Sequence, residues 1–220
     1  MSHLIFVLLL LLVSSSAAAH KIIFIEGTMG SGKTHLLNEL KEKFDNQYHD
    51  LCFAEEPYDA LTTSGILNSD FTDTGNVAIL QAFFMKLYTD QLHKLLRSGC
   101  KVLFVDRTIH ACFYVYLTGN TQPMHALYKH YLQQHPDLYS VYHNILFVNT
   151  DVNIAWQRIQ TRARSANEKA IPIEYIQHQH NKLTSMFNVL DANVHNSQIV
   201  DLMHVVCKFL QEHATKKIYE

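Results

Sequence analysis

A glycine-rich loop near the start of the sequence has the residue types needed to hold a chain of phosphates. Residues 27–34 read GTMGSGKT, which fits the pattern G-x-x-x-x-G-K-[ST]. The glycines let backbone N–H groups curl around phosphate oxygens, and the N-terminus of a following helix adds partial positive charge. In such a loop the lysine, here Lys33, reaches the β- and γ-phosphates, and the hydroxyl of Thr34 binds Mg²⁺. The loop therefore predicts binding of a nucleoside triphosphate.

Charged residues also follow three later apolar segments. Glu55 and Glu56, before Pro57, follow the first of these segments, and Asp106 and Arg107 follow the second. The third is followed by a helix that carries Arg158, Arg162 and Arg164. Phosphoryl transfer needs a carboxylate that deprotonates the acceptor hydroxyl, Mg²⁺ that bridges phosphates, and cations that stabilise the transferring group. Asp106, at the end of an apolar run, is placed like the aspartate that binds Mg²⁺ in phosphate-loop enzymes. Taken singly, each residue has the alternative of a surface charge beside a loop.

Apolar segments alternate with helical patterns along the whole sequence. Strands are expected at residues 22–26, 51–55, 101–105, 144–148 and 197–200. Helices are expected after the loop, at residues 77–96, 108–117 and 125–134, from an Asp151 cap to Arg162, from Pro172 to Leu190, and from the fifth strand to about residue 212. This alternation predicts an α/β fold of the P-loop NTPase type, a parallel five-stranded sheet with helices on both faces and a short arginine-rich lid. Ligands then gather at the carboxyl ends of the strands.

The composition fits one globular domain. The chain has 220 residues, of which 48% are hydrophobic and 17% charged. Its net charge of −2 does not indicate a general nucleic-acid-binding surface. The 15 histidines lack the spacing of a metal site and are expected at the surface and in packing. The cysteines lack C-x-x-C spacing, so buried free thiols are expected. They are Cys52, Cys100, Cys112 and Cys207.

A hydrophobic segment, residues 1–19, precedes the domain expected at residues 20–220. An apolar run at residues 4–13 is followed by serines and by three alanines that end at Ala19. This order matches a secretory signal, but Lys and Arg are missing before the run. The run is short for a bilayer span. A signal or anchor and a retained N-terminal helix on a cytosolic protein both stay open.

Five stretches together resemble the deoxynucleoside kinase family, which includes thymidine, deoxycytidine and deoxyguanosine kinases and insect and viral relatives. They are IEGTMGSGKT, EEP, LQAFF, VDRT and RIQTRARSANEKAIPIEYI. The resemblance covers the chain from Lys21 to about Leu190, and the RARS and IPIEYI segment is its most specific part. Thymidylate kinases share the loop and the Asp-Arg pair, but the EEP and RARS combination fits them less well.

The resemblance implies ATP-dependent and Mg²⁺-dependent phosphorylation of the 5′-hydroxyl of a deoxynucleoside, in nucleotide salvage for DNA synthesis. It implies a deoxynucleoside partner, a possible homodimer, and no nucleic-acid partner. A cytoplasmic location is expected for a salvage kinase, whereas residues 1–19 allow a secretory or membrane-anchored one. The alternatives are a nucleoside monophosphate kinase of the thymidylate type and a nucleotide-binding protein without turnover.

By the same resemblance, individual residues receive roles. Glu56 is the expected base, with Glu55 as a second candidate, and Arg107 is expected to contact the 5′-oxygen. The residues expected around ATP are Gly27, Thr28, Met29, Gly30, Ser31, Gly32, Lys33, Thr34 and the lid arginines Arg158, Arg162 and Arg164. The expected metal ligands are Thr34 and Asp106.

The expected substrate residues are Met29, Phe71, Gln81, Tyr116 and Glu168. Gln81 is expected to bond the base edge and Tyr116 to stack on the base. The sequence departs from the family at the sugar, because Phe71 replaces a tyrosine and cannot hydrogen-bond. Glu168 matches the family's sugar-binding glutamate only with a one-residue insertion, and Asn167 lies there without it. The family's tryptophan after the Glu-Pro pair is also missing, and Leu61 lies in that region.

Base preference follows from two further positions of the resemblance. Family members that favour deoxycytidine and purines place an arginine and an aspartate in the base pocket. The matching residues here are Tyr88 and Cys112. A pocket without the charged pair resembles the thymidine-accepting type, so thymidine or broad pyrimidine use is expected.

Overall fold

The structure is a computed structural model that describes residues 21–65, 74–115, 122–135, 144–162, 166–189, 193–197 and 199–214. The hydrophobic segment at residues 1–19 lies outside this part of the chain. Three of the expected site residues, Phe71, Tyr116 and Arg164, lie outside it as well. Among the described residues, no helix combines the length and the apolar character that a membrane crossing requires.

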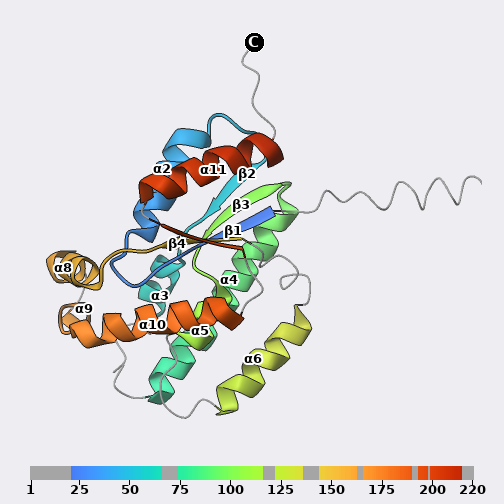
Figure 1. Ribbon diagram of the computed structural model, residues 1–220. Coiled ribbons are helices and arrows are strands. Elements are labelled where there is room, and N and C mark those ends of the chain that lie inside the picture. Colours follow the sequence, from blue (N-terminus) through green and yellow to red (C-terminus); the bar gives the residue numbers. More distant parts are fainter. Residues whose placement is uncertain are drawn as a thin grey trace, which may run out of the picture.

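A five-stranded parallel sheet forms the centre of the molecule (Figure 1). Its strands are β1 (Lys21–Glu26), β2 (Leu51–Ala54), β3 (Val102–Asp106), β4 (Asn144–Val148) and β5 (Asn193–Ser197). Their order across the sheet is β2-β3-β1-β4-β5, so β1 lies in the middle between β3 and β4. Ile25 of β1 is in register with Asp106 of β3. The expected α/β fold is confirmed, and the residues after β1, β2 and β3 meet at one edge.

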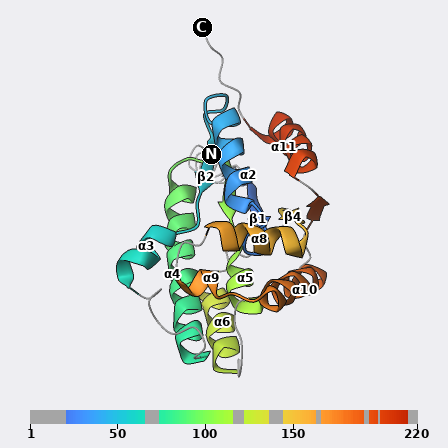
Figure 2. The same cartoon turned by 90° about the vertical axis from the view of Figure 1, so that its left-hand side faces the viewer.

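Helices cover both faces of the sheet (Figures 1 and 2). The described helices are α2 (Lys33–Phe44), α3 (Tyr58–Ser64), α4 (Thr74–Arg97), α5 (Ile109–Tyr114), α6 (Gln122–Gln134), α8 (Val152–Arg162), α9 (Ala166–Lys169), α10 (Ile173–Val189) and α11 (Ile199–His213). Successive side chains of a strand point to opposite faces. Ile22 and Phe24 therefore pack with residues of α4, α5 and α6, whereas Ile23 and Ile25 pack with α2 and α11. Such two-sided burial explains the continuous apolar runs of the inner strands.

Most expected elements are present with shifted ends, but the fifth strand was predicted at the wrong residues. The strand runs over Asn193–Ser197, and Ile199 and Val200, predicted as strand, begin α11. Leu202, Val206 and Leu210 are buried at four-residue intervals, so this apolar stretch forms one helix face rather than a strand. Among the described strands, β5 pairs with β4 alone and lies at the edge of the sheet, and its sequence NVHNS contains few apolar residues, so it lacks the apolar run that predicts a buried strand.

The predicted helix cap at Asp151 is confirmed. Its carboxylate oxygen Oδ1 accepts hydrogen bonds from the backbone N–H of Asn153 at 2.9 Å and of Ile154 at 3.3 Å. Capping satisfies backbone donors that have no partner within the helix. Asp151 thus fixes where α8, the helix of the lid arginines, begins.

Two of the cysteines predicted as free thiols instead form a disulfide. Cys52 of β2 is bonded to Cys100, which lies two residues before β3, with their Cα atoms 5.8 Å apart. The pairing of β2 with β3 brings these two residues together, which sequence spacing alone does not reveal. Cys112 and Cys207 are free.

We expect reduction of this disulfide to lower the free energy of unfolding by about 2–4 kcal/mol, because the bond restricts the unfolded chain. Urea unfolding with and without dithiothreitol measures this difference. The Cys52→Ser/Cys100→Ser double variant should match the reduced protein, and Cys207→Ser should match the oxidised one. An unfolding midpoint that does not respond to dithiothreitol would contradict the bond.

Candidate active site

The glycine-rich loop connects β1 to α2 and closes tightly against the start of α8. Gly30 has a φ of +78°, and a Cβ at this position would lie 2.2 Å from the carbonyl oxygen of Ala155. Gly32, the residue before α2, also has a positive φ of +105°. Side chains are disfavoured at such φ values. The glycines of the motif are therefore required here by backbone conformation and by contact with α8.

Lys33, the first residue of α2, is folded back over the loop. Its Nζ donates hydrogen bonds to the carbonyl oxygens of Gly27 and Thr28, both at 2.9 Å. Burial, together with the positive charge of Arg107, lowers the pKa of Lys33 to about 8, although nearby carboxylates oppose the change. A cation held inside the loop in this way is placed to meet phosphate oxygens.

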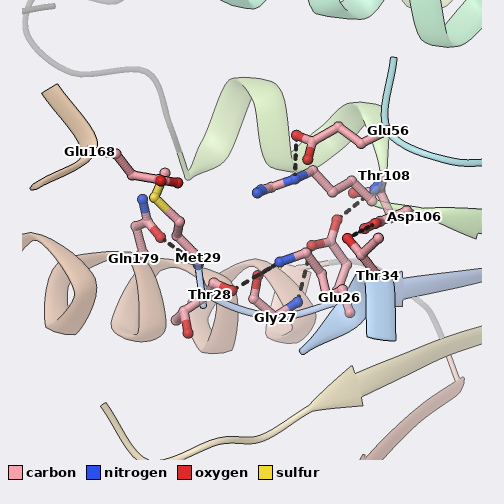
Figure 3. A network of polar contacts seen from close by, with 12 residues as sticks. Glu26, Gly27, Thr28, Met29, Thr34, Glu56, Asp106, Thr108, Glu168 and Gln179 are labelled. Atoms are coloured by element: carbon pink, nitrogen blue, oxygen red, sulfur yellow. Dashed lines mark hydrogen bonds and ion pairs between the residues drawn. The ribbon is translucent and has the colours of Figure 1, made fainter. Parts of the chain in front are cut away.

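Thr34 and Asp106, the two expected metal ligands, lie side by side. The Thr34 hydroxyl donates to Oδ2 of Asp106 at 2.8 Å (Figure 3). The other carboxylate oxygen, Oδ1, is buried and has no hydrogen-bond partner within the described part of the chain. Burial raises the pKa of Asp106, and the nearby Lys33 opposes this rise. Carboxylate and hydroxyl oxygens are the ligands that Mg²⁺ prefers, so this pair fits that ion.

Glu56 and Arg107 form an ion pair beside the loop. Nε of Arg107 lies 2.9 Å from Oε1 of Glu56. The Glu56 side chain keeps 20% of its surface exposed, whereas that of Arg107 keeps 9%. Burial by itself lowers the pKa of Arg107, but the charge of Glu56 outweighs it and the pKa rises above its ordinary value. The guanidinium is thus permanently charged next to a carboxylate that can reach a substrate.

The geometry separates the two glutamates of the EEP stretch. Glu55 lies at the surface, where its carboxylate is 3.4 Å from Nζ of Lys41. Glu56, the next residue, faces Arg107 in the site (Figure 3). Only Glu56 is therefore placed near the phosphate loop.

Arg107 has an unusual backbone conformation. Its φ is +79°, and it is the only non-glycine residue with positive φ in the described part of the chain. Its backbone N–H donates to the carbonyl oxygen of Ile25 at 2.9 Å. Such a conformation costs on the order of 1–3 kcal/mol and persists only where the surroundings impose it. Here it turns the chain sharply at the end of β3 and aims the side chain at Glu56.

Glu26, the last residue of β1, belongs to the site although the sequence analysis assigned it no role. It is fully buried, and its Oε1 accepts a hydrogen bond from the backbone N–H of Thr108 at 2.6 Å. Burial raises its pKa, and the neighbouring Arg107 opposes this rise. The available signal was a carboxylate at the end of an apolar strand, directly before the glycine loop. Glu26 ties the end of β1 to the turn after β3.

The lid arginines on α8 have different contacts. Nη1 of Arg158 donates to the carbonyl oxygen of Ser31 at 3.1 Å, so this residue lies over the phosphate loop. Arg162 instead forms an ion pair with Glu168 of α9. The structure therefore brings Arg158 to the expected triphosphate site and holds Arg162 against an expected substrate residue.

Two of the expected substrate residues, Met29 and Glu168, lie on the side of the site opposite Glu56 (Figure 3). Figure 3 shows Met29 and Glu168 lying together, opposite Glu56, with Gln179 of α10 beside them. Gln179, which was not predicted, accepts a hydrogen bond from the backbone N–H of Met29 at 3.0 Å. It lies 150 residues away from Met29 in the sequence, and no local pattern marks it. Gln81 of α4 is buried, with 6% exposure.

Comparison with known proteins gives a family match over most of the chain. The family model "dNK: Deoxynucleoside kinase" matches residues 23–214. Among solved structures, a deoxyadenosine kinase from M. mycoides, with the products dCMP and a flexible dCDP bound, superposes with a TM-score of 0.63. The two sequences are 17% identical, and the match covers 87% of this chain and 99% of the other. No curated protein sequence shows significant similarity to this chain.

We expect the affinity for ATP to fall as pH rises above about 8, because Lys33 then loses its charge while bound phosphates favour the charged form. The dissociation constant should rise roughly tenfold between pH 7 and pH 9. Titration calorimetry with Mg-ATP measures it. Lys33→Met should bind weakly at both pH values, and a native protein with no more pH dependence than this variant would contradict the assignment.

Proposed function

The chain belongs to the deoxynucleoside kinase family, and we propose that it uses ATP and Mg²⁺ to phosphorylate the 5′-hydroxyl of thymidine, or of pyrimidine deoxynucleosides more broadly. Phosphorylation of a deoxynucleoside is the reaction that membership of the family gives. The observation that supports this best is the Glu56–Arg107 pair beside the phosphate loop. A partly exposed carboxylate next to a triphosphate site is the arrangement that activation of an alcohol requires.

In this proposal Glu56 is the general base. Its carboxylate accepts the proton of the 5′-hydroxyl while the 5′-oxygen forms a bond to the γ-phosphorus and the bond to the leaving ADP oxygen breaks. Arg107, 2.9 Å from the carboxylate, orients it and can donate to the 5′-oxygen. The ion pair keeps both groups in place before the substrate arrives.

The phosphate loop binds ATP in the same proposal. The backbone of residues 27–34 and the ammonium of Lys33 would hold the phosphates, and Thr34 and Asp106 would hold Mg²⁺, whose charge would offset that of the phosphates. Arg158 lies over the loop, and the family resemblance implies that Arg162 and Arg164 belong to the same lid. A lid that excludes water favours transfer to the nucleoside over hydrolysis.

Base preference depends on the neutral character of two buried residues. Burial raises the pKa of both Tyr88 and Cys112, so neither is charged near neutral pH. Both belong to the buried cluster between α4, α5 and the sheet. Gln81, on α4 with Tyr88, supplies a planar amide that can form paired hydrogen bonds with a pyrimidine. This uncharged pocket supports thymidine or broad pyrimidine use.

Glu56→Gln should lower kcat for thymidine by roughly 10²–10⁴-fold, because the amide cannot accept the proton. ATP affinity, measured by calorimetry, should stay within about twofold of the native value, since the phosphate loop is intact. Glu55→Gln is the matched control and should keep native turnover, because Glu55 faces Lys41 at the surface. Normal turnover by Glu56→Gln would show that another group is the base.

A substrate panel tests the acceptor. With Mg-ATP, kcat/KM should be at least about tenfold higher for thymidine or deoxycytidine than for deoxyadenosine, because hydrogen-bond mismatches in a buried pocket are costly. Thymidine monophosphate should not be phosphorylated. Turnover of the monophosphate alone would identify a nucleoside monophosphate kinase, and ATP binding without any turnover would identify a non-catalytic nucleotide-binding protein.

A further inference from the structure

Gln179 contacts the phosphate loop with one end of its amide and leaves the other end without a partner. The residue is fully buried, and its Oε1 accepts the hydrogen bond from Met29 N–H at 3.0 Å. Because that backbone group is a donor, the amide oxygen must face it and Nε2 must point elsewhere. Nε2 is buried and has no hydrogen-bond partner among the residues that the structure describes. A donor is thus oriented and has no acceptor.

Buried donors without an acceptor are rare in folded proteins and costly to stability, so each one needs an explanation. Here the surroundings supply one. Figure 3 shows Gln179 and Glu168 together beside Met29, on the side of the site opposite Glu56. Arg162 holds the Glu168 carboxylate by an ion pair, and 12% of the Glu168 side chain is exposed. An unpartnered donor and a carboxylate acceptor therefore lie on the same side of the site, opposite Glu56.

We propose that Gln179 is a further substrate-binding residue, whose Nε2–H donates to the 3′-hydroxyl oxygen of the deoxyribose while Glu168 accepts the hydrogen of the same hydroxyl. This inference rests on the proposed function. A deoxyribose has only two free hydroxyls, so the one that is not at Glu56 is the 3′-hydroxyl. A hydroxyl both donates and accepts, and an amide with a carboxylate satisfies both properties. Phe71 has no polar group with which to supply the donor.

The same contact links the sugar to the phosphate loop. Gln179 holds Met29 through Oε1, and Met29 directly precedes Gly30 in the loop. A hydrogen bond from Nε2 to the sugar then holds in place the Gln179 amide, whose other end supports the loop. A purely structural role for Gln179 would affect every substrate equally, whereas this role depends on the 3′-hydroxyl.

The test compares thymidine with 3′-deoxythymidine, which lacks only that hydroxyl. Gln179→Met keeps the length of the side chain and removes the donor. It should lower kcat/KM for thymidine roughly ten- to hundredfold more than that for 3′-deoxythymidine, because loss of the contact with Met29 affects both substrates alike. Gln177→Leu, at an exposed position of the same helix, is the matched control and should leave both values unchanged.

A second variant keeps the contact with the loop if Gln179→Met does not fold. Gln179→Glu retains an acceptor for Met29 N–H and can donate from its other oxygen only when protonated. Its ratio of kcat/KM for thymidine to that for 3′-deoxythymidine should fall from pH 6 to pH 9, and the native ratio should not. Because Glu56 acts on both substrates, its titration cancels in this ratio.

Equal losses for the two substrates in Gln179→Met, or a pH-independent ratio in Gln179→Glu, would overturn the role of Gln179. Both results leave the proposed function intact if the native protein phosphorylates thymidine. Failure of the native protein to phosphorylate any deoxynucleoside would instead overturn the proposed function, and with it this inference. If another deoxynucleoside proves the better substrate, it and its 3′-deoxy analogue replace the thymidine pair.

Discussion

Opposite charges buried at the carboxyl ends of β1 and β3 are the constraint on which this site depends. Glu26, Asp106 and Arg107 lie at or directly after the ends of these neighbouring strands, and Lys33 begins the helix after β1. Moving a single charge out of water is expensive, and a buried charge is tolerated only with a partner. Burial and the partners shift the pKa values in opposite directions, as for Asp106, where burial raises the value and Lys33 lowers it. Each residue therefore requires the others.

The backbone conformation after β1 and β3 brings these charged side chains together. Arg107 takes a φ of +79° directly after β3, and the carbonyl oxygen of Ile25 holds its N–H. Gly30 lets the loop approach α8 more closely than any side chain would permit. The parallel register of β1 and β3, with Ile25 beside Asp106, brings both turns to the same edge. A nucleoside triphosphate and an acceptor alcohol can then meet over this edge, which is where ligands of open parallel sheets bind.

The two sides of the site differ in how they are built. The side that carries Glu56 and Arg107 comes from turns after strands, and its geometry follows from the sheet. The opposite side comes from α9 and α10, where Glu168 pairs with Arg162 and Gln179 reaches Met29. Helix packing rather than strand register sets this second side. In the proposed function, the helices would contact the sugar and the strand ends would carry the phosphate chemistry.

The phosphate-loop motif and the inner strands can be predicted from the residues alone, as can the choice of Thr34 and Asp106 as metal ligands, because these depend on local spacing and on the rule that parallel strands end at one edge. The tertiary structure shows that Glu56, which the family resemblance favours as the base, faces Arg107, whereas Glu55 lies at the surface beside Lys41; local pattern alone does not separate two adjacent glutamates. The tertiary structure also decided the position of β5, the Cys52–Cys100 bond and the contact of Gln179 with Met29. These three depend on an edge pairing or on segments far apart in the chain, and no residue pattern within one segment records such a contact.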